Sequence, residues 1–114
     1  MLGNLWIYVA GPYSKPDPIQ NTHNTLQIAD KILKLGGTPI IPHLSLLWHL
    51  YSPKEYVFWL EYNMEFLRKC QAVFRIQGES YGANEEEKVA HEIGIPIFYN
   101  LYDLTRWING TTTL

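Results

Sequence analysis

Short apolar runs alternate along the chain with segments in which apolar residues recur every three or four positions. The apolar runs lack the alternation of a half-exposed strand, so they predict strands that are buried on both faces. These strands are expected at residues 5–10, 38–41, 71–76 and 95–99. The periodic segments predict helices at residues 28–35, 53–69, 85–93 and, as a short last helix before a frayed Thr-rich end, 103–108.

Glycine and proline mark several of the predicted boundaries. Gly36-Gly37 follows the first helix and Gly94 follows the third, as expected where a helix ends. The segment Ser52-Pro53-Lys54-Glu55 has the pattern of a capping box, with proline at the first helical position. This pattern predicts a helix that begins at Pro53.

Strands that alternate with helices indicate an α/β fold. We expect a small doubly wound parallel sheet of about four strands, flavodoxin- or Rossmann-like, with helices on both faces. Right-handed crossovers favour the strand order 2-1-3-4, and ligands bind such sheets beyond the carboxyl ends of the strands, where the order reverses. The loops that meet there are residues 11–18 and 77–84. At 114 residues, the chain is expected to form a single domain over residues 1–114.

Charge and composition narrow the classes of partner. The net charge is −2 and the chain has no basic block, which argues against a nucleic-acid polymer or an anionic membrane as partner. Cys70 is the one cysteine, so no internal disulfide is expected. No apolar run approaches the roughly 20 residues of a membrane span, and the first residues lack the features of a leader. We therefore expect a cytoplasmic protein.

The segment Gly78–Glu87 is the main candidate for a ligand site, because it joins the third strand to a helix. Its small residues let backbone amides approach a ligand, and a helix start favours negative charge. A glycine-containing loop of this kind is also a common tight connection, so the loop alone does not decide between the two.

The phase of the following helix adds a more specific signal. The apolar residues that share one of its faces are Val89, Ala90 and Ile93. At about 100° per residue, Glu86 lies within about 15° of the centre of this face, whereas Glu85 and Glu87 point towards solvent. An inward carboxylate needs a partner or a function, since an unpaired buried charge is costly. Glu86 is therefore either directed at a ligand or satisfied by local amides.

Two motifs resemble the nucleoside 2-deoxyribosyltransferase superfamily, which includes hydrolases of 2′-deoxynucleoside 5′-phosphates and small uncharacterised relatives. They are Tyr8-Val-Ala-Gly-Pro-Tyr-Ser14 and Ser80-x-Gly82-Ala83-x-x-Glu86-x-x-x-Ala90. The resemblance runs from about Leu5 to Tyr99 and preserves the order of the motifs. It implies an enzyme that cleaves or transfers at the N-glycosidic bond of a nucleoside or nucleoside 5′-monophosphate.

The same resemblance implies roles for individual residues. Glu86 corresponds to the nucleophile that attacks the anomeric carbon and forms a glycosyl-enzyme intermediate. Ser80 corresponds to a residue that binds the 5′ end of the substrate, and Tyr13 is expected to orient the carboxylate. The substrate-binding positions are Gly11, Pro12, Ser14, Ser80, Gly82 and Ala83. Neither a cofactor nor a metal is implied.

The chain departs from the superfamily at two positions. Members commonly carry aspartate where this sequence has Asn63 and Gln71. The amide of Asn63 can still contact the sugar or the base, but it cannot transfer a proton to the leaving base. This leaves open an alternative function as a non-catalytic nucleotide-binding module of the same fold. A purely structural subunit would leave the inward Glu86 unexplained.

His43 and His49 could suggest a metal site, but their spacing matches no helical ligand pair. We expect them instead at the mouth of the pocket.

The helix predicted at residues 53–69 is apolar on two sides. Its expected core face carries Val57, Leu60, Met64 and Leu67. Its second face carries Trp59, Tyr62 and Phe66. A second apolar face in so small a chain predicts a homodimer or larger homo-oligomer, and the resembling enzymes are dimers or larger. The alternative is that the loop around Trp48 covers this face.

Overall fold

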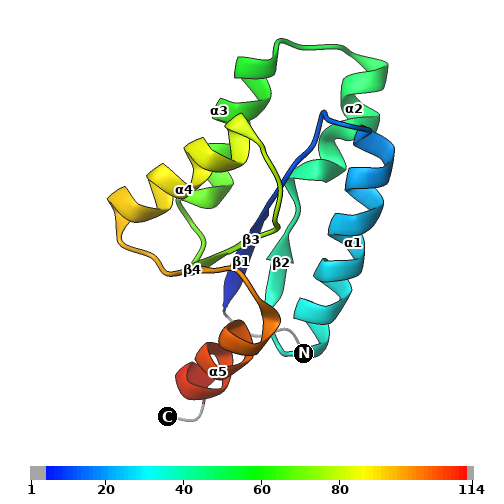
Figure 1. The fold of residues 1–114 in the computed structure, drawn as a ribbon. Helices are drawn as coiled ribbons and strands as arrows, with labels where there is room; N and C mark the ends of the chain where they lie inside the picture. Colours follow the sequence, from blue (N-terminus) through cyan, green and yellow to red (C-terminus); the bar gives the residue numbers. More distant parts are fainter. Residues whose placement is uncertain (1–4, 113–114) are drawn as a thin grey trace.

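The computed structural model describes residues 5–112, and within them a parallel sheet forms the centre of the molecule (Figure 1). Its strands are β1 (Trp6–Ala10), β2 (Thr38–Ile40), β3 (Ala72–Arg75) and β4 (Ile97–Phe98). They lie in the order β2-β1-β3-β4 and all pair in parallel. The α/β class and the strand order 2-1-3-4 predicted from the sequence are therefore confirmed.

The connections between the strands are mainly helical. The helices are α1 (Pro18–Lys34), the 3-10 helix η1 (Pro42–Ser45), α2 (Leu46–Tyr51), α3 (Tyr56–Leu67), α4 (Tyr81–Ile93) and α5 (Leu101–Thr112). α1 begins well before the predicted residue 28, because the Asp17 side chain accepts a hydrogen bond from the Ile19 amide (3.1 Å) and caps it. α5 continues past the predicted residue 108 as far as Thr112.

The start of α3 differs from the sequence prediction. The capping-box segment Ser52–Glu55 is not helical, and α3 begins only at Tyr56. The Lys54 amide donates to His49 Nδ1 (3.2 Å), while the Ser52 hydroxyl accepts from Lys54 Nζ (3.2 Å). The Ser52 amide, to which the Glu55 side chain of a capping box would bond, donates instead to the Trp48 carbonyl of α2 (2.8 Å). The apolar pattern did not reveal α2 or the turn after it.

Two apolar layers hold helices on both faces of the sheet, as predicted. On one face Ile7 and Val9 of β1 pack with Ile32 of α1 and with Leu104 and Ile108 of α5. On the other face, Tyr8 and Ala10 pack in a cluster whose helical members come from α3 and α4, namely Met64, Leu67, Ala83 and Ala90. The alternation along β1 places Tyr8 on the α3–α4 face. Among the described residues, no helix is long and apolar enough to cross a membrane.

The two faces of α3 differ in part from expectation. Met64 and Leu67 are buried as predicted, but Val57 is 60% exposed because α3 projects beyond the sheet at its start. On the second face, the Trp48 ring packs edge-on against the rings of Trp59 and Tyr62, with centroids 5.3 and 5.6 Å apart. The alternative that Trp48 covers this face is thus realised for these two rings, whereas Phe66 remains 39% exposed.

Candidate functional site

A cavity of about 250 Å³ opens beyond the carboxyl ends of the strands, where the loops after β1 and β3 meet. Most of the residues predicted for the site line it, namely Gly11, Tyr13, Ser14, Asn63, Ser80, Gly82, Ala83 and Glu86. Pro12 lies in the wall of a neighbouring hollow, and its carbonyl accepts a hydrogen bond from the ring of His43 (2.8 Å), which itself lines the cavity. The cavity therefore lies where the strand order predicts a ligand site, and residues from distant parts of the sequence line it.

Glu86 is the carboxylate of this cavity. It projects inward from α4 and is only 6% exposed, as its helical phase predicted. The Tyr8 hydroxyl donates a hydrogen bond to its Oε2 atom. Burial raises the pKa of Glu86 to about 7, although the Tyr8 hydrogen bond and the positive charge of Arg75 act in the opposite direction.

Tyr8 is a part of the site that the sequence did not reveal. Tyr13 was expected to orient the carboxylate, but the structure places the Tyr8 hydroxyl on Glu86 and the Tyr13 ring against His43 (centroids 5.6 Å apart). Burial raises the pKa of Tyr8 well above its usual value, so Tyr8 keeps its proton and acts as the donor. Strand parity could have found Tyr8, because it shares the sheet face towards which Glu86 points.

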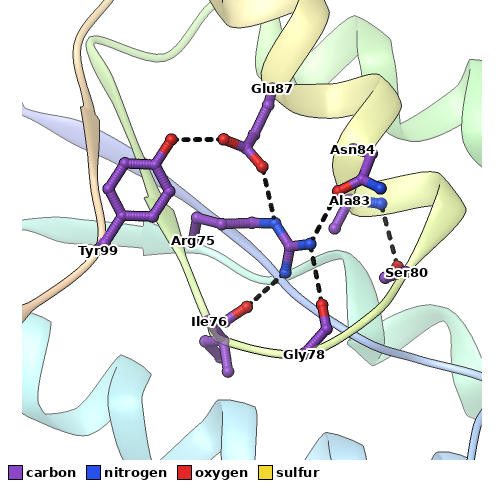
Figure 2. Close-up of polar contacts among 8 residues, drawn as sticks. All are labelled: Arg75, Ile76, Gly78, Ser80, Ala83, Asn84, Glu87 and Tyr99. Atoms are coloured by element: carbon purple, nitrogen blue, oxygen red, sulfur yellow. Dashed lines mark hydrogen bonds and ion pairs between the residues drawn. The ribbon is translucent and has the colours of Figure 1, made fainter.

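A network around Arg75 holds the loop between β3 and α4 in place (Figure 2). The Arg75 guanidinium pairs with Glu87 (3.0 Å) and donates to the Gly78 carbonyl and Asn84 Oδ1 (3.0 Å each). The Tyr99 hydroxyl donates to the second oxygen of Glu87 (2.5 Å). Glu87 is therefore a half-buried ion-pair partner and not the solvated residue that the helical phase predicted.

Ser80 directly precedes α4 and caps its amino end. Its hydroxyl accepts a hydrogen bond from the Ala83 amide (3.1 Å), so Ser80 is the N-cap (Figure 2). The hydroxyl proton remains able to donate to a ligand. Gly78 has φ +132° and a Cβ there would lie 2.7 Å from Pro12 Cγ, so the loop needs glycine at this position.

Aromatic rings also line the cavity, namely those of Tyr13, Tyr56, Trp59 and both histidines. His43 is 3% exposed and its Nε2 atom donates to the Pro12 carbonyl, while burial lowers its pKa and keeps it neutral. His49 Nδ1 accepts from Trp59 Nε1 (2.8 Å). Both histidines line the cavity, but His43 is buried in its wall and does not lie at the mouth as predicted.

The two departures from the superfamily have different positions. Asn63 lines the cavity. Gln71 lies at the amino end of β3, where its side chain accepts from the Trp6 amide (2.6 Å). Because the cavity lies at the carboxyl end of the sheet, Gln71 is not among the residues that line it, whereas Asn63 is.

Comparison with known structures shows the fold. The chain is similar to the 2-deoxyribosyltransferase from Leishmania mexicana, with a TM-score of 0.59 and 20% identity over 82% of this chain and 61% of that one. It is also similar to the 2-deoxyribosyltransferase from the psychrotolerant bacterium Bacillus psychrosaccharolyticus, with a TM-score of 0.55 and 19% identity over 85% of this chain and 78% of that one. The chain thus has a nucleoside 2-deoxyribosyltransferase-like fold and spans 61% of the length of the first of these enzymes.

No curated protein sequence matches the chain. Residues 5–100 match a family model described as a domain of unknown function, DUF7768. This match covers both predicted motifs and every side chain that lines the cavity. The chain belongs to the DUF7768 family, built on a 2-deoxyribosyltransferase-like fold.

Proposed function

We propose that the protein cleaves or transfers at the N-glycosidic bond of a nucleoside or nucleoside 5′-monophosphate, with Glu86 as the nucleophile. The observation that carries this proposal is the environment of the Glu86 carboxylate. Oε2 accepts a hydrogen bond from Tyr8, whereas Oε1 has no partner among the described residues. Glu86 is also one of the residues that line the cavity. A buried carboxylate with one fixed and one open oxygen is suited to attack a carbon atom placed in the cavity.

The reaction would proceed in two displacements at the anomeric carbon. In the first, Glu86 Oε1 forms a bond with C1′, the C1′–N bond breaks, and its electron pair leaves with the base, which takes a proton from water. In the second, water attacks C1′ and releases the sugar, or a second base attacks and forms a new nucleoside. Glu86 is regenerated as a carboxylate in either case.

The loop before α4 would hold the sugar and its 5′ end. The Ser80 hydroxyl can donate to a 5′-oxygen, and the buried Gly82 and Ala83 bring backbone close to the cavity. A Cβ atom at Gly82 would collide with the Tyr56 hydroxyl, so glycine there keeps this wall of the cavity open. We assign Tyr13, Gly11 and Ser14 to the other side of the sugar.

The binding-module alternative rests on Asn63. An amide cannot protonate the leaving base, so a pocket with Asn63 could bind nucleotides without turning them over. A catalytic carboxylate and a merely binding carboxylate differ in one respect, since only the first forms a covalent bond with the sugar.

A mechanism-based probe separates the two functions. A 2′-fluoro-substituted deoxynucleoside destabilises the oxocarbenium-like transition state and slows breakdown of a glycosyl-enzyme. After incubation with it, the protein should gain the mass of the fluorinated sugar, and fragmentation should place that mass on Glu86. Glu86→Gln should form no adduct and release no base from a panel of nucleosides and monophosphates. Base release that persists in this variant would refute the nucleophile assignment, and ligand binding without adduct or turnover would favour the binding module.

We also propose that the protein is a homo-oligomer that uses the helix predicted at residues 53–69, now α3, through its exposed side chains such as Phe66, together with the exposed side chains of α2. These helices expose large apolar side chains, including Leu47 (77%), Tyr51 (89%) and Phe58 (40%). Large exposed apolar patches on small proteins are typical of interaction surfaces.

A further inference from the structure

The orientation of the His49 ring is set by two hydrogen bonds on one side. His49 Nδ1 accepts from the indole Nε1 of Trp59 (2.8 Å) and from the Lys54 amide (3.2 Å). An indole and a backbone amide are donors only, so the Nδ1 atom must offer its lone pair to them. The proton of the neutral ring therefore resides on Nε2.

The Nε2–H group of His49 has no acceptor among the residues that the structure describes, although His49 is half-buried and lines the cavity. In the part of the chain that the structure describes, the buried side-chain polar atoms without a partner are Thr22 Oγ1 and His43 Nδ1. Since His49 Nε2 has no partner and is not one of these two, it is accessible. It is thus a donor of fixed position on a residue that lines the cavity, and the reaction proposed above does not use it.

The topology places His49 opposite Glu86. α4, which carries Glu86, follows β3, whereas η1 and α2, which carry His43 and His49, follow β2. Since β1 lies between β2 and β3, these helices stand on either side of its carboxyl end (Figure 1). A nucleophile attacks a sugar carbon from the side opposite the leaving group. The base bonded to that carbon would therefore extend away from α4, towards η1 and α2.

The wall on that side has the chemistry of a base subsite. The ring of Tyr13, beside His43, and the ring of Trp59, beside His49, line the cavity and supply flat apolar surface, which suits stacking with a nucleobase. We propose that His49 is the base-recognition residue, and that its Nε2–H donates a hydrogen bond to a ring nitrogen or carbonyl oxygen on the edge of the base. Trp59 positions His49 by holding its tautomer. This inference rests on the proposed function, because it takes the ligand to be a nucleoside.

The tautomer can be tested first, without any ligand. Long-range ¹H–¹⁵N NMR of the whole chain should show His49 protonated at Nε2 and bare at Nδ1. In Trp59→Phe, which keeps a ring but removes one donor, the signals should shift towards a mixture of tautomers. A wild-type ring protonated at Nδ1 would overturn the inference.

Binding then tests recognition of the base. In a Glu86→Gln background, so that no ligand is consumed, the affinities for 2′-deoxyadenosine, 2′-deoxyguanosine, 2′-deoxycytidine and thymidine are measured by calorimetry. For the bases that bind, His49→Phe should weaken binding about three- to tenfold, the effect of one neutral hydrogen bond. His49→Gln, whose amide can still donate, should recover part of it. Binding of 2-deoxyribose 5-phosphate, which has no base, should be equal in all of these proteins, and His23→Phe on the exposed side of α1 is the matched control.

The outcomes distinguish this inference from the proposed function. Unchanged nucleoside affinity in His49→Phe, equal affinities of the Phe and Gln variants, or a loss that also affects the base-free sugar phosphate would overturn the role of His49. So would failure of all four nucleosides to bind. Nucleoside binding that depends on His49, in a wild-type protein that releases no base, would support the base subsite while refuting the N-glycosidic reaction.

Discussion

The buried carboxylate of Glu86 should make the stability of the protein depend on pH in a way that a single substitution removes. Burial raises the pKa of Glu86 from 4.5 to about 7. A pKa raised in the folded state means that folding favours the neutral form, so this stabilisation is complete below about pH 4.5 and is lost as the pH rises through about 7. At about 1.4 kcal/mol for each pKa unit, the loss is about 3 kcal/mol, a substantial part of the stability of a domain this size.

Glu86→Gln isolates this contribution, because the amide has nearly the same shape and its oxygen can still accept from Tyr8. We expect the free energy of unfolding of the variant, relative to wild type, to rise by about 3 kcal/mol between pH 4.5 and pH 8. Urea denaturation followed by tryptophan fluorescence at several pH values measures it, since other titrating groups are common to both proteins and cancel. The same experiment bears on the proposed mechanism, because Glu86 must be ionised to act as a nucleophile. The pH-dependent difference in stability measures the free energy that ionising it costs in the folded protein.

Glu85→Gln is the matched control for this experiment. Glu85 is the preceding residue of α4, and its carboxylate bonds Lys88 at the surface (3.2 Å). A surface pair of this kind contributes little, so the stability difference for Glu85→Gln should stay within about 0.5 kcal/mol across the same pH range. Parallel stability curves for wild type and Glu86→Gln would refute the reasoning, because they would mean that the carboxylate is solvated in the folded protein.

Three further changes test other parts of the site and surface. Tyr8→Phe removes a hydrogen bond that lowers the pKa of Glu86, so the pH at which base release reaches half its maximum should move upward. A rise of about one pKa unit should lower release at pH 7 about five- to sixfold, and an unmoved profile would contradict this. Asn63→Asp should raise base release severalfold if the proton on the leaving base limits turnover; an equal or lower rate in steady-state assays would show that another group limits it. Phe66→Glu places a charge on the exposed side of α3 and should convert an oligomer to monomer in sedimentation; a wild-type protein that is already monomeric at micromolar concentration would exclude this interface.

The sequence by itself determined the sheet and the place of its main carboxylate. Apolar runs such as Leu5–Ala10, bounded by glycine and proline, favour strands covered on both faces, and the handedness of crossovers then leaves one favoured strand order, which the structure has. The inward direction of Glu86 follows from helical phase alone, because that phase is a local property of α4. Local periodicity was sufficient to predict the direction of a side chain where that direction depends only on the residue's own helix or strand.

Only the tertiary structure decided what surrounds Glu86. Tyr8 and Glu86 are 78 residues apart in the sequence. Strand parity places Tyr8 on the sheet face that Glu86 points towards, but it does not show which core side chain of that face reaches the carboxylate. Gln71 is distant from the cavity because it precedes β3, whereas Asn63 reaches the cavity from α3. Local signals failed likewise at Ser52–Glu55, where hydrogen bonds to His49 and within the turn outweigh the capping pattern. Contacts of this kind depend on which segments folding brings together, and no local periodicity records them.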